Sequence, residues 1–402
     1  MITSDTIILG LLALVLGFVF YTRDKPGWTK FYTFVPIILV CYLLPSLMVT
    51  FGLIDVSESN LWPVAKDYFL PAALFLMTLS IDMKGVIGLG PKALIMFFTA
   101  TIGIILGGPL ALWIVAQFDP SILGEGMNEA WRGLATLAGS WIGGGANQTA
   151  MLEIYGYNIE RYSALIAVDI IVANIWMAFL LWGAGDSERI DRWLKADSSS
   201  IDRLRDKMAN YTSSVERVAS SNDYVLLFGG TFAVVGLSHF LADFLSVFFT
   251  DIAPESFAAS QFFWVVVFAT TFGLAASFTK ARSLEGIGAS KFGTVFIFML
   301  VAVIGTKMDI FKLAEAPAFM AIGLIWMLFH SVLLLVVARI IHAPFFFVAV
   351  GSKANVGGAA SAPVVASAFH PALAPVGVLL AVLGYAVGTY GAILCAQMMS
   401  LI

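Results

Sequence analysis

The sequence predicts an all-α polytopic membrane protein with about ten transmembrane helices and two glycine-rich re-entrant hairpins, arranged as two inverted repeats. Three observations lead to this prediction. Hydrophobic residues make up 60% of the 402 residues and charged residues only 12%, whereas a soluble protein carries about a quarter charged residues. Apolar runs with the length of a bilayer span, about 20 residues, recur along the chain. Two similar glycine-rich segments interrupt this pattern, one late in each half.

The apolar runs give the order of the expected spans. The first run does not have the form of a cleaved signal peptide, because Asp5 precedes it, Arg23 and Lys25 follow it, and no small-residue cleavage site is present. We therefore expect it to remain as a span. The ten expected spans are 6–22, 31–53, 67–83, 93–117, 160–184, 223–249, 258–279, 292–306, 315–341 and 372–400.

A polar segment at 186–222 divides the chain into a first repeat at 1–185 and a second repeat at 223–402. Its apolar residues recur at alternating steps of three and four, which predicts an amphipathic linker helix. We expect this helix to dock on the membrane domain, and packing against a second subunit is the alternative. The apolar positions are Ile201, Leu204, Met208, Tyr211, Val215 and Val218.

The two glycine-rich segments are GSWIGGGANQTA at 139–150 and GSKANVGGAASA at 351–362. Interrupted polar backbone is tolerated at membrane depth only where it is buried in protein or lines a cavity. Its occurrence at corresponding places in two halves indicates the binding site of a secondary transporter. We expect hairpins at about 134–158 and about 343–369. Close packing of small residues between crossing helices is the alternative.

The basic residues favour re-entrant over crossing segments, because short cytoplasmic loops carry an excess of Arg and Lys. If both segments are re-entrant, each repeat has five spans, the repeats are inverted and both termini are extracytoplasmic. The cytoplasmic side then receives 16 of the 22 basic residues and the outside receives five, while Lys353 lies in the second hairpin. If both segments cross, the basic linker falls outside, which fits the rule badly.

The hairpin tips combine glycines with amide and hydroxyl side chains. Glycine lets a ligand approach the backbone closely, and broken helices offer N–H groups to anions and carbonyl groups to Na⁺. We expect a small polar or anionic solute to bind at these tips. The candidate solute-binding residues are Ser140, Gly143, Gly144, Gly145, Asn147, Gln148, Thr149, Ser352, Asn355, Gly357, Gly358 and Ser361.

Asp169 lies within the fifth expected span, directly after the first hairpin. A carboxylate in hydrocarbon is costly, so it is normally paired, protonated or functional. We predict that Asp169 binds the coupling ion, with Asn174 as a second candidate. Five residues along a helix correspond to about 140° of rotation, so these two side chains do not face the same way. A structural hydrogen bond is the alternative role for Asp169.

Lys353 is a basic residue inside the second hairpin. It is a candidate charge partner of Asp169 or of an anionic solute, and the alternative is that its side chain extends to the cytoplasmic surface.

Other kinds of site have no sequence signal. Cys41 and Cys395 lie in apolar runs without metal or disulfide spacing, and no metal cluster, nucleophile triad or phosphate loop is present. A net charge of −4 gives no reason to expect a nucleic-acid partner. We therefore expect no enzyme, no resident cofactor, and Na⁺ at most as a coupling ion.

Both glycine-rich segments and the order of the spans resemble a bacterial membrane-protein family known as domain-of-unknown-function family 819, over nearly the full chain. They are more distantly similar to citrate/sodium symporters and to cation/proton antiporters. The resemblance implies an elevator-like carrier in the bacterial cytoplasmic membrane, in which a domain with both hairpins moves against a scaffold that forms a homodimer. This chain departs from the antiporters because it lacks an Asp-Asp or Asn-Asp pair at Asp169.

These observations together predict a secondary active transporter for a small polar or anionic solute, coupled to Na⁺ or H⁺. A cation/proton antiporter without an organic substrate is one alternative. A membrane-embedded enzyme or scaffold and a channel are the others.

Overall fold

The computed structural model describes residues 1–35, 37–196, 201, 204, 219–253, 257–308, 311 and 316–402. These residues form an all-helical protein, and the extended backbone contact recorded among them is one bridge between Ile2 and Ile54. The apolar composition explains this architecture, because a helix satisfies its backbone hydrogen bonds internally.

Six helical segments in the described part of the chain are long and apolar enough to cross a membrane. A seventh candidate is the pair α13 (Gln261–Ser277) and η8 (Lys280–Ile287), which is bent by 96°. The six are α1 (Asp5–Arg23), α7 (Pro91–Phe118), the segment Ile159–Gly185 that includes α9 (Tyr162–Gly185), α12 (Ser221–Ile252), α15 (Ala316–Ile340) and α18 (Ala374–Met399).

The other three expected spans, 31–53, 67–83 and 292–306, are shorter or interrupted helices. They correspond to α2 (Thr29–Phe34) with α3 (Ile37–Thr50), to α4 (Leu61–Val64), η2 (Ala65–Phe69) and α5 (Leu70–Leu79), and to α14 (Ala289–Gly305). At 1.5 Å per residue, the 17 residues of α14 cover about 26 Å, less than the roughly 30 Å of a hydrocarbon core. By length and composition the described residues thus support six or seven spans, where the sequence predicted ten.

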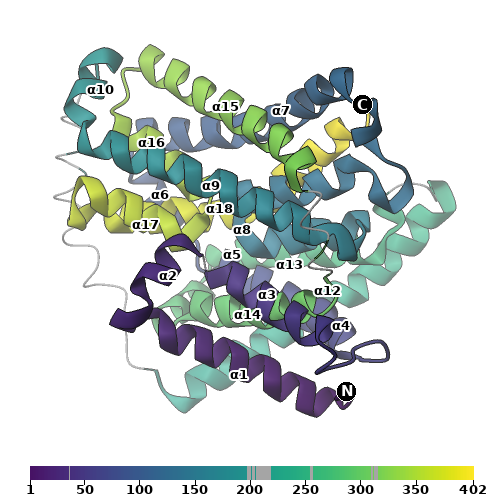
Figure 1. The fold of residues 1–402 in the computed structure, drawn as a ribbon. Helices are drawn as coiled ribbons and strands as arrows, with labels where there is room; N and C mark the ends of the chain where they lie inside the picture. Colours follow the sequence, from purple (N-terminus) through teal and green to yellow (C-terminus); the bar gives the residue numbers. More distant parts are fainter. Residues whose placement is uncertain are drawn as a thin grey trace.

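The helices pack in two groups (Figure 1). The α5 group consists of α1, α3, α5, α12, α13 and α14. The α18 group consists of α7, α8 (Ala130–Tyr155), α9, α15, α16 (Phe345–Asn355), α17 (Gly358–Phe369) and α18. The groups meet where α5 and α13 contact α8 and α18, and where α3 contacts α9.

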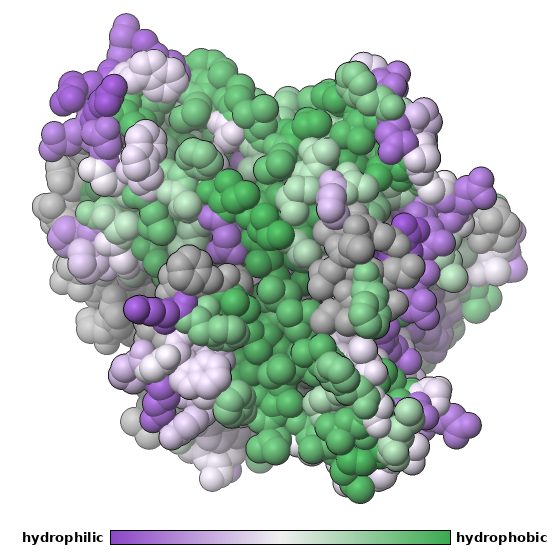
Figure 2. All heavy atoms as spheres, viewed as in Figure 1, coloured by the Kyte–Doolittle hydropathy of each residue, from purple (hydrophilic) through white to green (hydrophobic). Residues whose placement is uncertain are grey.

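Both termini lie at one end of the helices, which we call the terminal end (Figure 1). The opposite end carries α10 (Ser187–Leu194) and is called the α10 end. Figure 2 shows a broad apolar face between two polar edges, the pattern expected of a protein that crosses a bilayer.

Polar contacts join the loops at the α10 end. Lys92 Nζ donates to His342 O at 2.9 Å, and Arg282 pairs with Asp82 at 2.8 Å. The distribution of Arg and Lys in the sequence predicts that these basic residues lie on the cytoplasmic side. At the terminal end, Lys66 pairs with Glu153 at 3.4 Å. The loops assigned to one side by their charges therefore contact one another.

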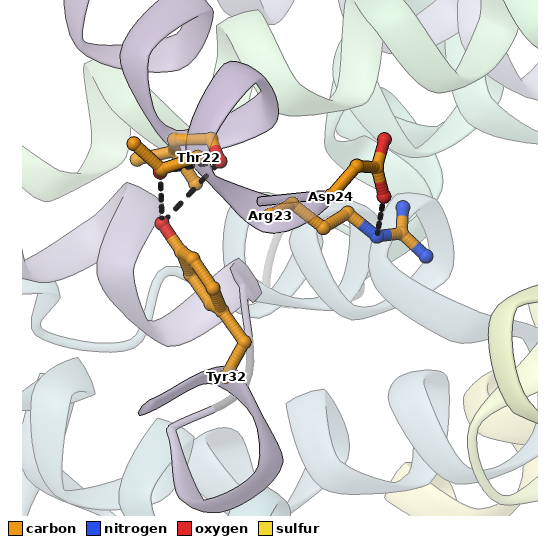
Figure 3. Close-up of polar contacts among 5 residues, drawn as sticks. Thr22, Arg23, Asp24 and Tyr32 are labelled. Atoms are coloured by element: carbon orange, nitrogen blue, oxygen red, sulfur yellow. Dashed lines mark hydrogen bonds and ion pairs between the residues drawn. The ribbon is translucent and has the colours of Figure 1, made fainter. Parts of the chain in front are cut away.

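The end of α1 is tied to α2 by a buried hydroxyl (Figure 3). Thr22 Oγ1 and Tyr32 OH lie 2.8 Å apart, and Tyr32 OH also donates to Val19 O at 3.3 Å. The neighbouring pair of Arg23 and Asp24 is solvent-exposed, with 3.9 Å between its charged atoms. Exposed pairs of this kind add little stability, so the Thr22–Tyr32 contact fixes the turn between the two helices.

The predicted linker helix at 186–222 lies mostly outside the described residues. Its described start is α10, and Leu194 and Leu204 are buried in an apolar cluster with Phe345 at the start of α16.

Candidate functional site

The first glycine-rich segment lies at a sharp break in α8. Gly144 has φ 75° and ψ −171°, whereas the residues around it are helical. A straight helix of 26 residues would be about 39 Å long. Instead, Arg132 Nη1 donates to Tyr155 O at 2.6 Å, so the two ends of α8 lie side by side. The chain therefore folds back at Gly144, and the residues 143–145 are called the first tip.

The two arms of α8 touch because small residues face one another. A Cβ at Gly139 would lie 2.6 Å from Asn147 O and 2.9 Å from Gln148 N. No side chain fits between the arms at this point, which is a physical reason for the glycine in the motif.

The second glycine-rich segment has the same shape in two separate helices. α16 ends at Asn355 and α17 begins at Gly358, while Gly357 and Gly358 have φ values of 118° and 58°. The rings of Phe346 and Phe369, at the far ends of the two helices, are 5.3 Å apart. The chain thus folds back at residues 355–358, which are called the second tip.

Both tips meet on α18 at its glycines. A Cβ at Gly384 would lie 2.8 Å from Ile142 O and 3.3 Å from Ala354 O, the carbonyl oxygens of the last helical turn before each tip. Gly388, one turn further along, lies directly against Gly143. Two helix C-terminal ends therefore converge at one point inside the α18 group.

Asn147 and Asn355 are fully buried, and each fixes its tip to a crossing helix. Asn147 Nδ2 donates to Gly143 O at 3.1 Å and to Tyr385 O at 2.9 Å, and its Oδ1 accepts from Thr389 at 2.5 Å. Each of these partners belongs to the protein interior, so the structure gives Asn147 a positioning role at the tip.

Asn355 makes the corresponding contacts with α7. Its Nδ2 donates to Gly351 O at 3.0 Å and to Phe97 O at 3.3 Å, and its Oδ1 accepts from Thr101 at 2.9 Å. The second tip is thereby fixed to α7, as the first is fixed to α18.

Asp169 on α9 faces the first tip. Its carboxylate accepts hydrogen bonds from Ser140 Oγ at 2.7 Å, from Trp141 Nε1 at 2.7 Å and from Gln148 Nε2 at 3.1 Å. The structure thus brings together Asp169, Ser140 and Gln148, which the sequence singled out separately. Trp141 was not among the predicted site residues, although it lies inside the motif.

Lys353 is only 2% exposed, so its side chain does not extend to the membrane surface. Its Nζ donates to Ala173 O on α9 at 3.1 Å and interacts electrostatically with Asp169. The ammonium group also lies beneath Gly357, since a Cβ there would be 3.2 Å from Nζ. Lys353 therefore links the second tip to the helix that carries Asp169.

Ser352 belongs to a separate buried network. Its Oγ accepts from Trp176 Nε1 at 2.7 Å and lies 2.8 Å from His330 Nε2, while His330 Nδ1 lies 3.1 Å from Ala100 O. Because a carbonyl oxygen only accepts, His330 Nδ1 carries the proton and Ser352 donates to Nε2. Ser352 thus connects α16 to α9 and α15.

The remaining candidates differ in position. Thr149 Oγ1 donates to Gly145 O at 3.0 Å within the first tip region. Ser361 Oγ is buried without a hydrogen-bond partner in the first turns of α17. Asn174 is exposed and donates to Ile170 O at 2.8 Å, so it lies apart from Asp169, as the helical rotation predicted.

A cavity of about 730 Å³ opens beside the second tip at the α10 end. Its lining includes Ala359 of α17 and Tyr385 of α18, next to both tips, and the ion pair of Asp82 and Arg282 near its polar side. Asp82, Arg282 and Tyr385 were not among the predicted site residues. The sequence signals for Asp82 were its place at the end of an apolar run and a weak similarity between the stretches around Asp82 and Asp309.

Two further residues near Asp169 were not predicted from the sequence as site residues. Tyr42 on α3 and Tyr162 on α9 are at most 1% exposed, and their rings pack edge to face with the centroids 6.4 Å apart. Both interact electrostatically with Asp169. An aromatic residue in an apolar run gives no sign of such a role, since most are simply core residues.

Groups of three or more His, Cys, Asp or Glu residues able to hold a metal ion do not occur in the described part of the chain. The groups that the site offers are hydrogen-bond donors, backbone carbonyl groups and the charged side chains of Asp169 and Lys353.

Comparison with known proteins confirms the resemblance to domain-of-unknown-function family 819. Residues 10–402 match the family described as "Protein of unknown function (DUF819)". The chain is also similar to the uncharacterized membrane protein YjcL of Bacillus subtilis (strain 168), with 22% identity over 342 residues, 83% of this chain and 82% of that protein.

Proposed function

Because this chain belongs to the DUF819 family of proteins of unknown function, we propose its function from the site itself: it is a secondary active transporter for a small polar or anionic solute, coupled to Na⁺ or H⁺. The observation that carries this proposal is the meeting of two broken, folded-back helices at Gly384, together with the partly buried carboxylate of Asp169 and the buried ammonium group of Lys353. Broken helices at membrane depth supply the binding groups of many secondary transporters.

Under this proposal, each pair of arms is a re-entrant hairpin and the chain has ten spans in two inverted repeats. The packing of the helices supports it, because contacts in one half have counterparts in the other. α1 packs on α14, as α12 packs on α5, and α3 packs on α14, as α13 packs on α5. In the same way, α9 packs on α15 and α18 packs on α7.

We further propose that the α18 group is the moving domain of an elevator-like carrier and the α5 group its scaffold, through which two copies form a homodimer. Both tips, Asp169 and Lys353 belong to the α18 group. The extensive hydrogen bonding of both tips to α7 and α18 would let this group move as one body.

The volume of the cavity indicates the size of the proposed solute. Pockets for small molecules have volumes of about 300–1,000 Å³, and this one has about 730 Å³. Its residues Arg282, in η8, and Lys291, in the first turn of α14, belong to a region that the excess of basic residues assigns to the cytoplasm. In this reading the carrier is open to the cytoplasm, with both termini outside.

One observation favours a second candidate, the cation/proton antiporter. A carboxylate within a membrane span, such as Asp169, is a group that can exchange a cation for a proton without an organic solute. The cavity beside the second tip favours the solute carrier, because an antiporter of small cations needs no space of this size.

Thermal unfolding of the detergent-purified protein tests both candidates. The melting temperature is measured in Na⁺ and in K⁺ across about pH 5–9, for the wild type and for Asp169→Asn. A ligand present at about 100 times its Kd stabilises by about 2.7 kcal/mol. Stabilisation by Na⁺ that disappears in Asp169→Asn would identify a sodium-coupled protein.

A pH dependence that differs between the two proteins, without any effect of Na⁺, would identify the proton. If neither ion distinguishes them, Asp169 is structural and ion coupling at this residue is excluded. The same assay with a set of carboxylates, amino acids and sugar acids separates the carrier, which must respond to a solute, from the antiporter, which must not.

A further inference from the structure

The ammonium group of Lys353 is buried but lies directly under the open side of the second tip. Lys353 is 2% exposed, whereas Gly357 above it is exposed. A Cβ at Gly357 would be 3.0 Å from Lys353 Cε and 3.2 Å from Nζ. Only a residue without a side chain therefore separates this cation from a solute bound at the tip.

The hydroxyl of Ser361 lies at the same place. It is buried, makes no hydrogen bond, and would contact the same added Cβ at Gly357. A carboxylate of the solute at this position would receive a hydrogen bond from Ser361 and the charge of Lys353, and the positive end of the α17 helix dipole would add to both.

On its other side, Lys353 Nζ donates to Ala173 O at 3.1 Å, one helical turn beyond Asp169 on α9, so Lys353 is the cation next to Asp169. The titratable groups facing Asp169 are Lys353 on α16 and the phenols of Tyr42 on α3 and Tyr162 on α9. α15, which also packs on α9, carries His330, and both its ring nitrogens are engaged by Ala100 and Ser352. Among the described residues, the charge balance of this region thus depends on one anion and one cation.

A net charge within the hydrocarbon region is far more costly than a neutral pair. The empty site is neutral when Asp169 is ionised and Lys353 is protonated. A bound carboxylate adds one negative charge to the site. The site becomes neutral again only when one proton binds as well. That proton binds to Asp169, because the solute carboxylate now pairs with Lys353.

We propose that a solute anion and a proton bind together at Asp169 and Lys353. The solute carboxylate pairs with Lys353, and Asp169 takes up one proton from water. This rests on the proposed transport function and deepens it. It defines the solute as an anion, the coupling ion as H⁺, and the ratio as one proton for each negative charge.

The proton step is chemically simple. One O–H bond forms at a carboxylate oxygen of Asp169, with the proton coming from water. Ser140 Oγ, 2.7 Å from Oδ2, then rotates its own proton away and accepts this hydrogen bond. Trp141 Nε1 continues to donate to Oδ1.

The donor set around Asp169 also favours H⁺ over Na⁺. Sodium needs several oxygen lone pairs. Asp169 instead receives N–H groups from Trp141 and Gln148, and an indole N–H has no lone pair to offer. A proton needs only the carboxylate itself.

Infrared difference spectroscopy on the purified, solute-free protein tests this linkage. The wild type, Lys353→Met and Lys353→Gln are compared at neutral pH, each with and without Asp169→Asn, and Lys353→Arg is the control that keeps the charge. We expect ionised Asp169 in the wild type and in Lys353→Arg. In Lys353→Met and Lys353→Gln we expect one protonated carboxyl group for each chain, absent when Asp169→Asn is added.

Asp169 that stays ionised without Lys353 would overturn the proposal, because the two charges would then not be linked. If neither Lys353→Met nor Lys353→Gln folds, the infrared difference between the wild type and Asp169→Asn decides whether Asp169 is ionised in the resting protein. A protonated Asp169 in the resting wild type leaves no proton to be taken up, and it would overturn the proposal equally. The readout here is the protonation state of Asp169, whereas the proposed transport function is tested separately by the response of the melting temperature to solutes.

Discussion

Asn147 and Asn355 make the same three kinds of hydrogen bond, although they belong to different tips. Each side chain donates to the carbonyl four residues earlier and to a carbonyl of a crossing helix, and each accepts from a threonine four residues further along that helix. The helix is α18 for Asn147 and α7 for Asn355. Both N–H donors and the oxygen are used, so each amide fixes the position of its tip.

Replacing either asparagine with alanine should destabilise the protein. Asn147→Ala and Asn355→Ala each leave two buried carbonyl groups without these donors, and an unsatisfied buried group costs about 1–3 kcal/mol. We expect lower melting temperatures for both variants, together with loss of uptake. The control is Asn174→Ala, because Asn174 makes the same bond to a carbonyl four residues earlier but is exposed. Equal stability of Asn147→Ala and Asn174→Ala would refute a positioning role for Asn147.

Gly388 should not tolerate a methyl group. An added Cβ would meet Gly143 Cα and lie 2.8 Å from Asn147 Nδ2, so α18 and the first tip would have to separate. Overpacking of this kind costs about 1–3 kcal/mol. We expect Gly388→Ala to lower the melting temperature. Gly236→Ala on α12, with no atom within 4 Å of the added Cβ, should have little effect. Similar results for the two variants would mean that the tip does not pack on α18 as described.

The side assignment of the loops can be measured by cysteine labelling in intact cells. Single cysteines at Ser57 and Glu125 should react with a membrane-impermeant maleimide from outside, and one at Glu188 only after the membrane is opened. All three positions are exposed, and the native Cys41 and Cys395 are buried. Labelling of positions 57 and 188 from the same side would exclude the proposed topology.

Asp191 gives a prediction for pH. Its Oδ1 accepts from Phe345 N at 2.7 Å at the start of α16. Burial raises the pKa of Asp191 above its ordinary value of 3.8, and the bond from Phe345 N opposes this shift. The folded state therefore favours the protonated form. The contribution of this group to stability is largest below 3.8 and declines as the pH rises through the raised pKa.

The matched variants are Asp191→Asn and Asp191→Ala. Asp191→Asn keeps an oxygen for Phe345 N but has no charge to bury, so at neutral pH it should melt no lower than the wild type. Asp191→Ala removes the acceptor and should melt lower than both. If Asp191→Asn were as unstable as Asp191→Ala, the charge itself would be needed, contrary to the expected effect of burial.

Much of the site was predictable because its residues are chemically unusual for their surroundings. Asp169 is a carboxylate in an apolar run, and the glycine motifs are polar segments between apolar ones. The equivalence of Asn147 and Asn355 was not predictable from the motif alignment. Pairing Gly139 with Gly351 places Asn147 opposite Ala359, because Asn147 follows its break at Gly144 whereas Asn355 precedes the break at Gly357.

The order of residues along the chain is enough to specify a helical membrane protein with two interrupted segments and an acidic residue after the first of them. These properties follow from the composition of short stretches, because lipid selects apolar runs and penalises each charge separately. Three-dimensional packing brings both tips together at Gly384, places Lys353 against Gly357 and against α9, the helix of Asp169, and leaves a cavity that reaches the second tip. Those relationships join residues that are mostly far apart in the chain, and close packing, rather than local composition, brings them together.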